Sequence, residues 1–190
     1  MQNYIFTLSA MLILLMTSCS EQGSQASVTT KPAPAKQIQQ QTKLPTRSNQ
    51  TSIQLTISSV DVKKGEEACV SLMASDFDGI MAYQHSINFD PSQLQYVSAK
   101  NFGLPHLSEA NFGATKAAAG SINFLWYDMN VKGISVADKT KVFDLCFKAL
   151  AEKGSSCKVK ISDTPIKMEV VGPQKQKLQL KSSQGEINVR

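Results

Sequence analysis

The chain has 190 residues, of which 42% are apolar and 18% are charged, so it holds one ordinary domain with appendages and not two full-sized domains. Its four cysteines are widely spaced with no C-x-x-C pair, which argues against a disulfide-dense miniprotein and a four-thiolate zinc cluster. The net charge is +5, but residues 19–50 carry four basic and one acidic residue, which leaves the remainder at +2 without the basic clusters of a nucleic-acid-binding protein.

Residues 1–18 contain no charged side chain, and their apolar stretch is too short for a stable membrane-spanning helix. We interpret this segment as a secretory signal peptide. The sequence LMTSC that ends it, at 15–19, resembles the lipobox of bacterial lipoproteins. The resemblance implies that Cys19 is lipidated and becomes the mature N-terminus, and Ser20 after it implies sorting to the outer membrane. We therefore expect a secreted, lipid-anchored protein on a bacterial outer membrane or cell surface, whose one contact with the membrane is its lipid.

Residues 20–50 contain seven Gln, three Pro and no aromatic residue. Such a segment cannot bury enough apolar surface to offset the entropy lost on ordering. We predict that residues 19–50 comprise the lipidated cysteine and a disordered tether. A flexible chain of this length spans roughly 30 Å, which would hold a domain away from the membrane.

From residue 51 to the end, apolar and polar residues alternate with a period of two between turn-forming segments. This pattern predicts an all-β domain over 51–190. The interval 102–119 lacks the alternation, and a single helical turn near 107–110 is the one helix that we expect there. The expected strands are 53–57, 68–74, 80–89, 94–99, 121–127, 142–150, 158–161, 166–171, 178–180 and 186–189.

Four segments in this order resemble the cohesin domain: 80–94 with its Phe-Asp-Pro-x-x-Leu ending, 120–128 (GSINFLWYD), 142–147 (VFDLCF) and 185–189 (GEINV). The resemblance covers nearly all of 52–189. It implies a nine-stranded jelly-roll β-sandwich and a non-catalytic role as a receptor for dockerin-type or other protein partners. Related sandwiches are carbohydrate-binding modules, so polysaccharide binding is the alternative function.

Secretion would place the cysteines in an oxidising compartment. Strand parity turns Cys69 and Cys146 away from the core. Because the cohesin topology makes their strands neighbours, the resemblance implies a Cys69–Cys146 disulfide with Cys157 unpaired. Pairing of Cys157 with either of the other two remains the competing arrangement.

Alignment with the family places its polar dockerin-contacting positions at Ala82, Gln84, Leu125 and Asp128. Leu125 is expected to face outward beside Tyr127, which suits a protein-binding patch with an apolar centre. The alternative is that a neighbouring loop covers Leu125, or that it is one of the single apolar residues found on every surface. The predicted partner-binding residues are Gln84, Leu125, Tyr127 and Asp128.

Sugar binding by a β-sandwich generally uses a row of exposed aromatic rings. Trp126 shares its strand parity with core residues, so it is not a candidate. The remaining candidates are Tyr127, Tyr96, and Phe77 or Phe102 in loops.

No catalytic motif is present. His85 lies among apolar residues of one strand face and is expected in the core, whereas His106 lies in a loop without a nearby acid or nucleophile. Asp76 and Asp78 imitate part of a calcium loop, but the EF-hand spacing requires a Glu where Ile87 stands. The sequence therefore predicts a non-enzymatic protein without cofactor, metal or nucleic-acid partner.

Overall fold

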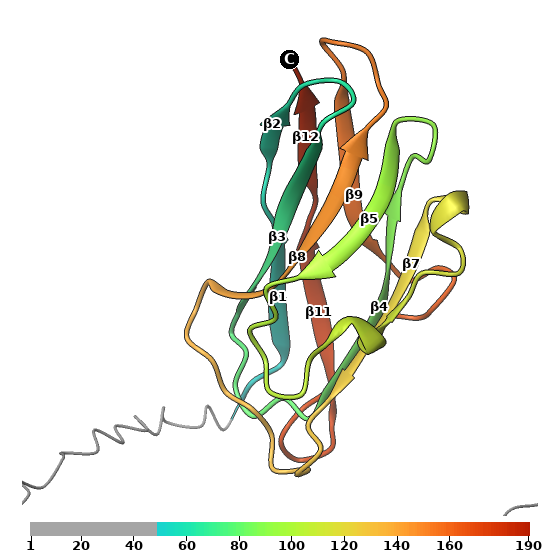
Figure 1. Ribbon diagram of the computed structural model, residues 1–190. Coiled ribbons are helices and arrows are strands. Elements are labelled where there is room, and N and C mark those ends of the chain that lie inside the picture. Colours follow the sequence, from blue (N-terminus) through green and yellow to red (C-terminus); the bar gives the residue numbers. More distant parts are fainter. Residues whose placement is uncertain (1–48) are drawn as a thin grey trace, which may run out of the picture. The chain divides into compact units, whose positions relative to one another are not determined.

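The computed structural model describes residues 49–190, which form twelve strands and two short 3-10 helices (Figure 1). No helix in this part of the chain is long and apolar enough to cross a bilayer. The predicted signal peptide, Cys19 and the tether up to residue 48 lie outside the described residues. The elements are β1 (Ser52–Ile57), β2 (Val60–Val62), β3 (Glu67–Ser75), β4 (Ala82–Phe89), β5 (Leu94–Lys100), η1 (Glu109–Asn111), β6 (Phe112–Gly113), η2 (Ala117–Ala119), β7 (Ser121–Tyr127), β8 (Thr140–Ala149), β9 (Ser156–Ser162), β10 (Glu169–Val171), β11 (Lys177–Ser183) and β12 (Gly185–Val189).

Two sheets pack face to face, and β11 pairs with a strand of each (Figure 1). The first sheet has the order β11-β1-β3-β8-β5. The second is centred on β4, which pairs with β7 along one edge and with β9 and β10 along the other. The pairs β1–β11 and β2–β12 are parallel, and the other strand pairs are antiparallel. This arrangement confirms the predicted all-β sandwich.

The core lies between the sheets because alternate residues of each strand point inward. In β7, Ile122, Phe124 and Trp126 are fully buried, while the residues between them are partly or well exposed. The Trp126 indole N–H donates to the carbonyl of Pro105 at 2.9 Å, which satisfies the one polar atom of this buried ring. The segment between β5 and β7 thus covers one side of the sandwich.

Each predicted strand is present, but the strand count exceeds the expected nine. Two strands were not predicted: β2 has three residues and β6 has two, which is too short to show a period. Strand β4 begins at Ala82 and not at residue 80, because Ile80 forms an isolated β-bridge with Ile134 instead. The predicted helical turn is found as η1, two residues later than expected, and η2 was missed.

Cys69 and Cys146 lie directly opposite each other on β3 and β8 and form a disulfide. Their Cα atoms are 4.0 Å apart. This is the pairing that the resemblance implied, and neither alternative bridge through Cys157 is formed. The free thiol of Cys157 is fully buried in β9, and burial raises its pKa, with Asp90 adding to the effect. It packs as a small core residue.

Candidate functional site

The outer face of β4 and β7 brings together three of the four predicted partner-binding residues, Gln84, Leu125 and Tyr127. The two strands are antiparallel, with Gln84 opposite Leu125 and Ala82 opposite Tyr127. Leu125 is 46% exposed and Tyr127 is 54% exposed, although both flank the fully buried Trp126. Leu125 is therefore not covered by a loop, which excludes one of the alternatives considered for it.

Strand β10 extends this face on the other side of β4, with Glu169 opposite Gln84. The Gln84 amide donates to the carbonyl of Lys167 at 3.3 Å, which orients the Gln84 side chain toward β10. Glu169 forms an ion pair with Lys177 of β11 at 2.6 Å, and this pair is well exposed. The face therefore has charged and amide groups over β4, β10 and β11, beside apolar side chains on β7.

Sequence reasoning missed two exposed apolar residues in the loop that follows this face. Met129 and Val131 follow β7 directly in the chain, and each is 61% exposed. We call Leu125, Tyr127, Met129 and Val131 the apolar strip. Their signal in the sequence was a run of alternating apolar residues that continues past the strand into a turn. Single exposed apolar residues are common, but several together mark a binding surface.

Asp128 organises the loop that carries the end of the strip. Its buried carboxylate accepts hydrogen bonds from the backbone N–H groups of Asn130, Lys132 and Gly133 at 3.0, 2.8 and 2.9 Å. Burial opposes ionisation, but these bonds outweigh it and lower the pKa of Asp128 below its ordinary value. The carboxylate is thus directed into its own loop, and a direct contact of Asp128 with a partner stays a prediction.

The same loop holds Val131 at a φ of 54°. This left-handed conformation is costly for a β-branched side chain and persists only where the surroundings enforce it. The hydrogen bonds of Asp128 on both sides of Val131 supply that constraint. The loop therefore presents an exposed valine in a defined conformation.

The two histidines lie where the sequence placed them. His85 is fully buried in the core, and its ring stacks on Phe124 with centroids 5.1 Å apart. Burial lowers the pKa of His85 to about 4, although a hydrogen bond to the carbonyl of Ser86 acts in the opposite direction. His106 is exposed in the loop before η1. His85 is therefore a packed core residue.

Within residues 49–190, one group of three potential metal ligands lies close together: Glu67, Cys69 and Cys146. Both sulfur atoms belong to the disulfide and so are not thiolate ligands. Asp78 belongs to the calcium-like sequence and is buried. It accepts a hydrogen bond from the hydroxyl of Ser135, in the loop between β7 and β8. These contacts stabilise the loop within the chain.

The aromatic residues considered for sugar stacking do not form an exposed row. Phe77 is only 1% exposed and packs edge-on against Tyr83, so its expected loop exposure is wrong. Tyr96 and Phe102 are half-buried against the core. Of the four candidates, Tyr127 alone presents an exposed ring.

Comparison with known families identifies this sandwich. The model of the cohesin domain matches residues 53–189. The chain belongs to the cohesin family. Cohesin domains are non-catalytic protein-binding modules, which agrees with the predicted function and with the absence of an enzymatic motif from the sequence.

Solved cohesins share the fold at low sequence identity. The sixth cohesin of scaffoldin B from Acetivibrio cellulolyticus, solved in complex with the Cel5 dockerin, is 22% identical over 74% of this chain and 100% of its own, with a TM-score of 0.63. The OlpA cohesin of Clostridium thermocellum, solved with the dockerin Doc918, is 15% identical over 73% and 99%, with a TM-score of 0.60. A non-cellulosomal cohesin from the archaeon Archaeoglobus fulgidus is 12% identical over 73% and 91%, with a TM-score of 0.57. No curated protein matches the sequence.

Proposed function

We propose that this cohesin domain binds a dockerin-type module through the outer face of β4 and β7, with the apolar strip at the centre of the contact. The observation that carries the proposal is the exposure of Leu125 and Tyr127 on the sheet and of Met129 and Val131 beside it. Burying such side chains against a partner is favourable, and they gain nothing comparable within the chain. Solved relatives in complex with dockerins support the choice of partner.

The polar neighbours of the strip fit the rim of an interface. The amide of Gln84 lies one strand away from Leu125, and the Glu169–Lys177 ion pair joins the next two strands, β10 and β11. Exposed charged and amide groups of this kind contribute more to orientation and specificity than to affinity. Ala82 lacks a polar group at a position where the family has a contact, so we expect this domain to prefer a dockerin with an apolar residue facing it.

The proposal includes a membrane anchor at Cys19, outside the described residues. Lipidation there would hold the domain at the outer membrane or cell surface and make it a receptor for assembly. The test is metabolic labelling of the full chain with palmitate. We expect label in the natural sequence and none in Cys19→Ala; labelling of both would contradict an anchor at this residue.

The binding face is tested with the full chain and a panel of dockerin modules that begins with the Cel5 dockerin. We expect at least one dockerin to bind and Leu125→Asp combined with Gln84→Ala to weaken that binding about a hundredfold, because a carboxylate would be buried in the interface. Val97→Asp is the matched control, since Val97 is also 46% exposed but lies on β5 of the other sheet. Equal loss in both variants would contradict the proposed face, and no binding across the panel would contradict a dockerin partner.

A further inference from the structure

A second surface feature lies at the far end of β4 from the apolar strip. Tyr127 pairs with Ala82 at the start of β4, whereas Asn88 at its end pairs with Ser121. Around Asn88 and Ser121 opens a pocket of about 780 Å³ whose lining comes from β4, β7, β9 and the loops beside them. On β7, Ser121 is four residues from Leu125, which is roughly 13 Å along the strand.

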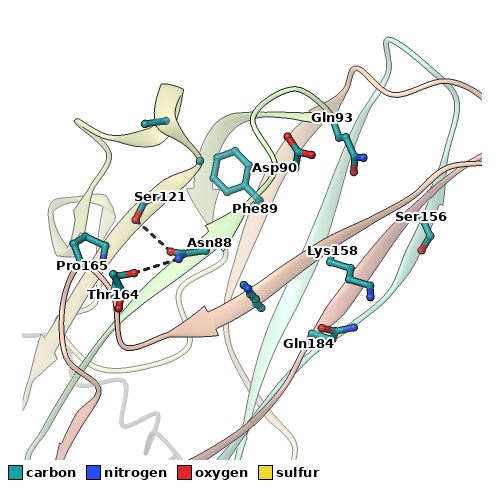
Figure 2. Close-up of a pocket in the computed structure, with 13 residues that line it drawn as sticks. Asn88, Phe89, Asp90, Gln93, Ser121, Ser156, Lys158, Thr164, Pro165 and Gln184 are labelled. Atoms are coloured by element: carbon teal, nitrogen blue, oxygen red, sulfur yellow. Dashed lines mark hydrogen bonds between the residues drawn. The ribbon is translucent and has the colours of Figure 1, made fainter.

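Polar groups form both sides of this pocket (Figure 2). On one side, Asn88 donates to the carbonyl of Thr164 at 3.2 Å and accepts from the hydroxyl of Ser121 at 3.3 Å. These bonds join three segments that are distant in sequence. On the other side lie Lys158 and Gln184. The pocket is thus lined by amide and hydroxyl groups, which both donate and accept hydrogen bonds.

Two lysines give the pocket its charge. Lys158 and Lys160 lie on the same face of β9, two residues apart, so their Cα atoms are separated by roughly 7 Å along the strand. Both are exposed, and no ion pair joins either of them to a residue in the described part of the chain. Glu186 lies opposite Lys158 on β12, but its carboxylate accepts a hydrogen bond from Ser156 at 2.9 Å.

One carboxylate, that of Asp90, also lines the pocket. Asp90 accepts hydrogen bonds from the N–H and hydroxyl of Ser92 at 2.9 and 2.6 Å, which form a local turn after β4. The Ser92 hydrogen bonds lower the pKa of Asp90, so this carboxylate is ionised and the lining carries two positive charges against one negative charge, a net charge of +1. An anionic ligand is favoured over a cationic one.

The pocket lacks the features that would suit an apolar or ring-stacking ligand. Phe89 is the one aromatic side chain of its lining, and it is 7% exposed. A protein partner that inserts an apolar side chain would find no apolar cleft here, in contrast to the apolar strip. The chemistry matches a ligand rich in hydroxyl groups that carries regularly repeated negative charges.

We infer that this pocket binds an acidic polysaccharide, a polymer whose sugar units carry carboxylates. Lys158 and Lys160 form ion pairs with successive carboxylates, while Gln184, the second N–H of the Asn88 amide and the lone pairs of the Ser121 hydroxyl exchange hydrogen bonds with the sugar hydroxyls. The site is separate from the dockerin-binding face, so one domain holds a protein partner at one end of β4 and a cell-surface or substrate glycan at the other.

The test measures binding of the full chain to polygalacturonate by isothermal titration calorimetry at low salt. We expect binding that weakens about tenfold when Lys158→Gln and Lys160→Gln are combined, since each exposed ion pair contributes modestly. The charge-matched control combines Lys63→Gln with Lys148→Gln, two exposed lysines outside the pocket, and should bind as the natural chain does. Fully methyl-esterified polygalacturonate, which has lost its charge, should bind more weakly than the free acid.

Three results would overturn the inference: no binding of polygalacturonate, equal loss in the two double variants, or equally tight binding of polyglutamate, which would show that charge alone is recognised. The outcome is independent of the dockerin proposal. Leu125→Asp should leave polygalacturonate binding unchanged while it weakens dockerin binding, so each can fail without the other.

Discussion

The two sheets of this cohesin domain present different outer faces. On the β3–β8–β5 sheet, the buried carboxylate of Asp144 accepts from Ser71 at 2.6 Å and from Asn101 at 2.7 Å, and it pairs with Lys141 at 3.1 Å. The Cys69–Cys146 disulfide joins two strands of the same sheet. On this face, the carboxylate of Asp144 and the two cysteine sulfurs are bonded to other groups of the same chain.

On the β4–β7 sheet the outer face leaves its largest side chains without such partners. Leu125 and Tyr127 are about half exposed on β7, and Met129 and Val131 are more so in the next loop. The first face thus contributes to the stability of the isolated domain, whereas we propose that the second is covered when a partner binds. Mutations on the first face should therefore change the free energy of unfolding, and mutations on the second should change binding.

The disulfide should give the largest effect on stability. Cys69→Ser combined with Cys146→Ser should lower the free energy of unfolding by about 4 kcal/mol, because the bridge joins residues 77 apart and restricts the unfolded chain. Urea denaturation under non-reducing conditions measures the difference. Cys157→Ala is the control, because it leaves the bridge intact. Adding reductant should lower the free energy of unfolding of this variant by the same amount as that of the natural chain. A double variant as stable as the natural chain would contradict a structural bridge.

His85 should give the next largest effect, and it depends on pH. The pKa of His85 is about 4 in the folded chain against 6.5 in the unfolded chain, so between these values the unfolded state binds a proton that the folded state does not. Stability should therefore fall as the pH drops from 6.5 to 4, by about 3 kcal/mol in total.

His85→Phe removes that titration and keeps a ring against Phe124. Urea denaturation at several pH values should show a flatter dependence between pH 4 and 6.5 in this variant. Val97→Ala, which keeps His85 and changes an exposed side chain without charge, should keep the natural slope. A slope that is unchanged in His85→Phe would show that other groups cause the acid sensitivity.

Asp144 should have an intermediate effect. Asp144→Ala removes a charged acceptor from Ser71, Asn101 and Lys141, and we expect a loss of about 2 kcal/mol in thermal unfolding. Burial raises the pKa of Asp144, but the three hydrogen bonds and the Lys141 charge outweigh burial, so the net effect lowers this pKa. The contribution of Asp144 to the free energy of unfolding should therefore persist until the pH falls through the lowered pKa. Lys141→Ala, which removes one exposed partner, should cost less; an equal cost would contradict a central role for the carboxylate.

Leu125→Asp should have the smallest effect on stability, within about 0.5 kcal/mol, because the side chain is exposed and packs against little. The same variant should lose dockerin binding, which separates the roles of the two faces. Thermal unfolding alongside the binding assay measures both. A loss of stability comparable to that of Asp144→Ala would show that Leu125 belongs to the packed structure of the sheet.

Some of the proposed binding face could be predicted from the sequence and some could not. The exposure of Leu125 and Tyr127 followed from strand parity, since neighbours in a strand point to opposite sides. The conformation of the loop with Met129 and Val131 could not be predicted, because it depends on hydrogen bonds of Asp128 to residues further along the chain. The pocket beside Asn88 was missed for a related reason: its sides come from three strands and the loops beside them, and no local pattern in the sequence indicates which of them meet.

By itself, the sequence determined the all-β class, the strands of the sandwich and most of its buried residues. A period of two is a local property, and strands such as β1, β3, β7 and β9 display it clearly. Tertiary structure alone decided which sheet edge each strand joined, how β11 connects the two sheets, and where Lys158 and Lys160 lie relative to Asn88. Those relations are between residues far apart in the chain, and they are set by which packing buries the apolar faces of all the strands at once.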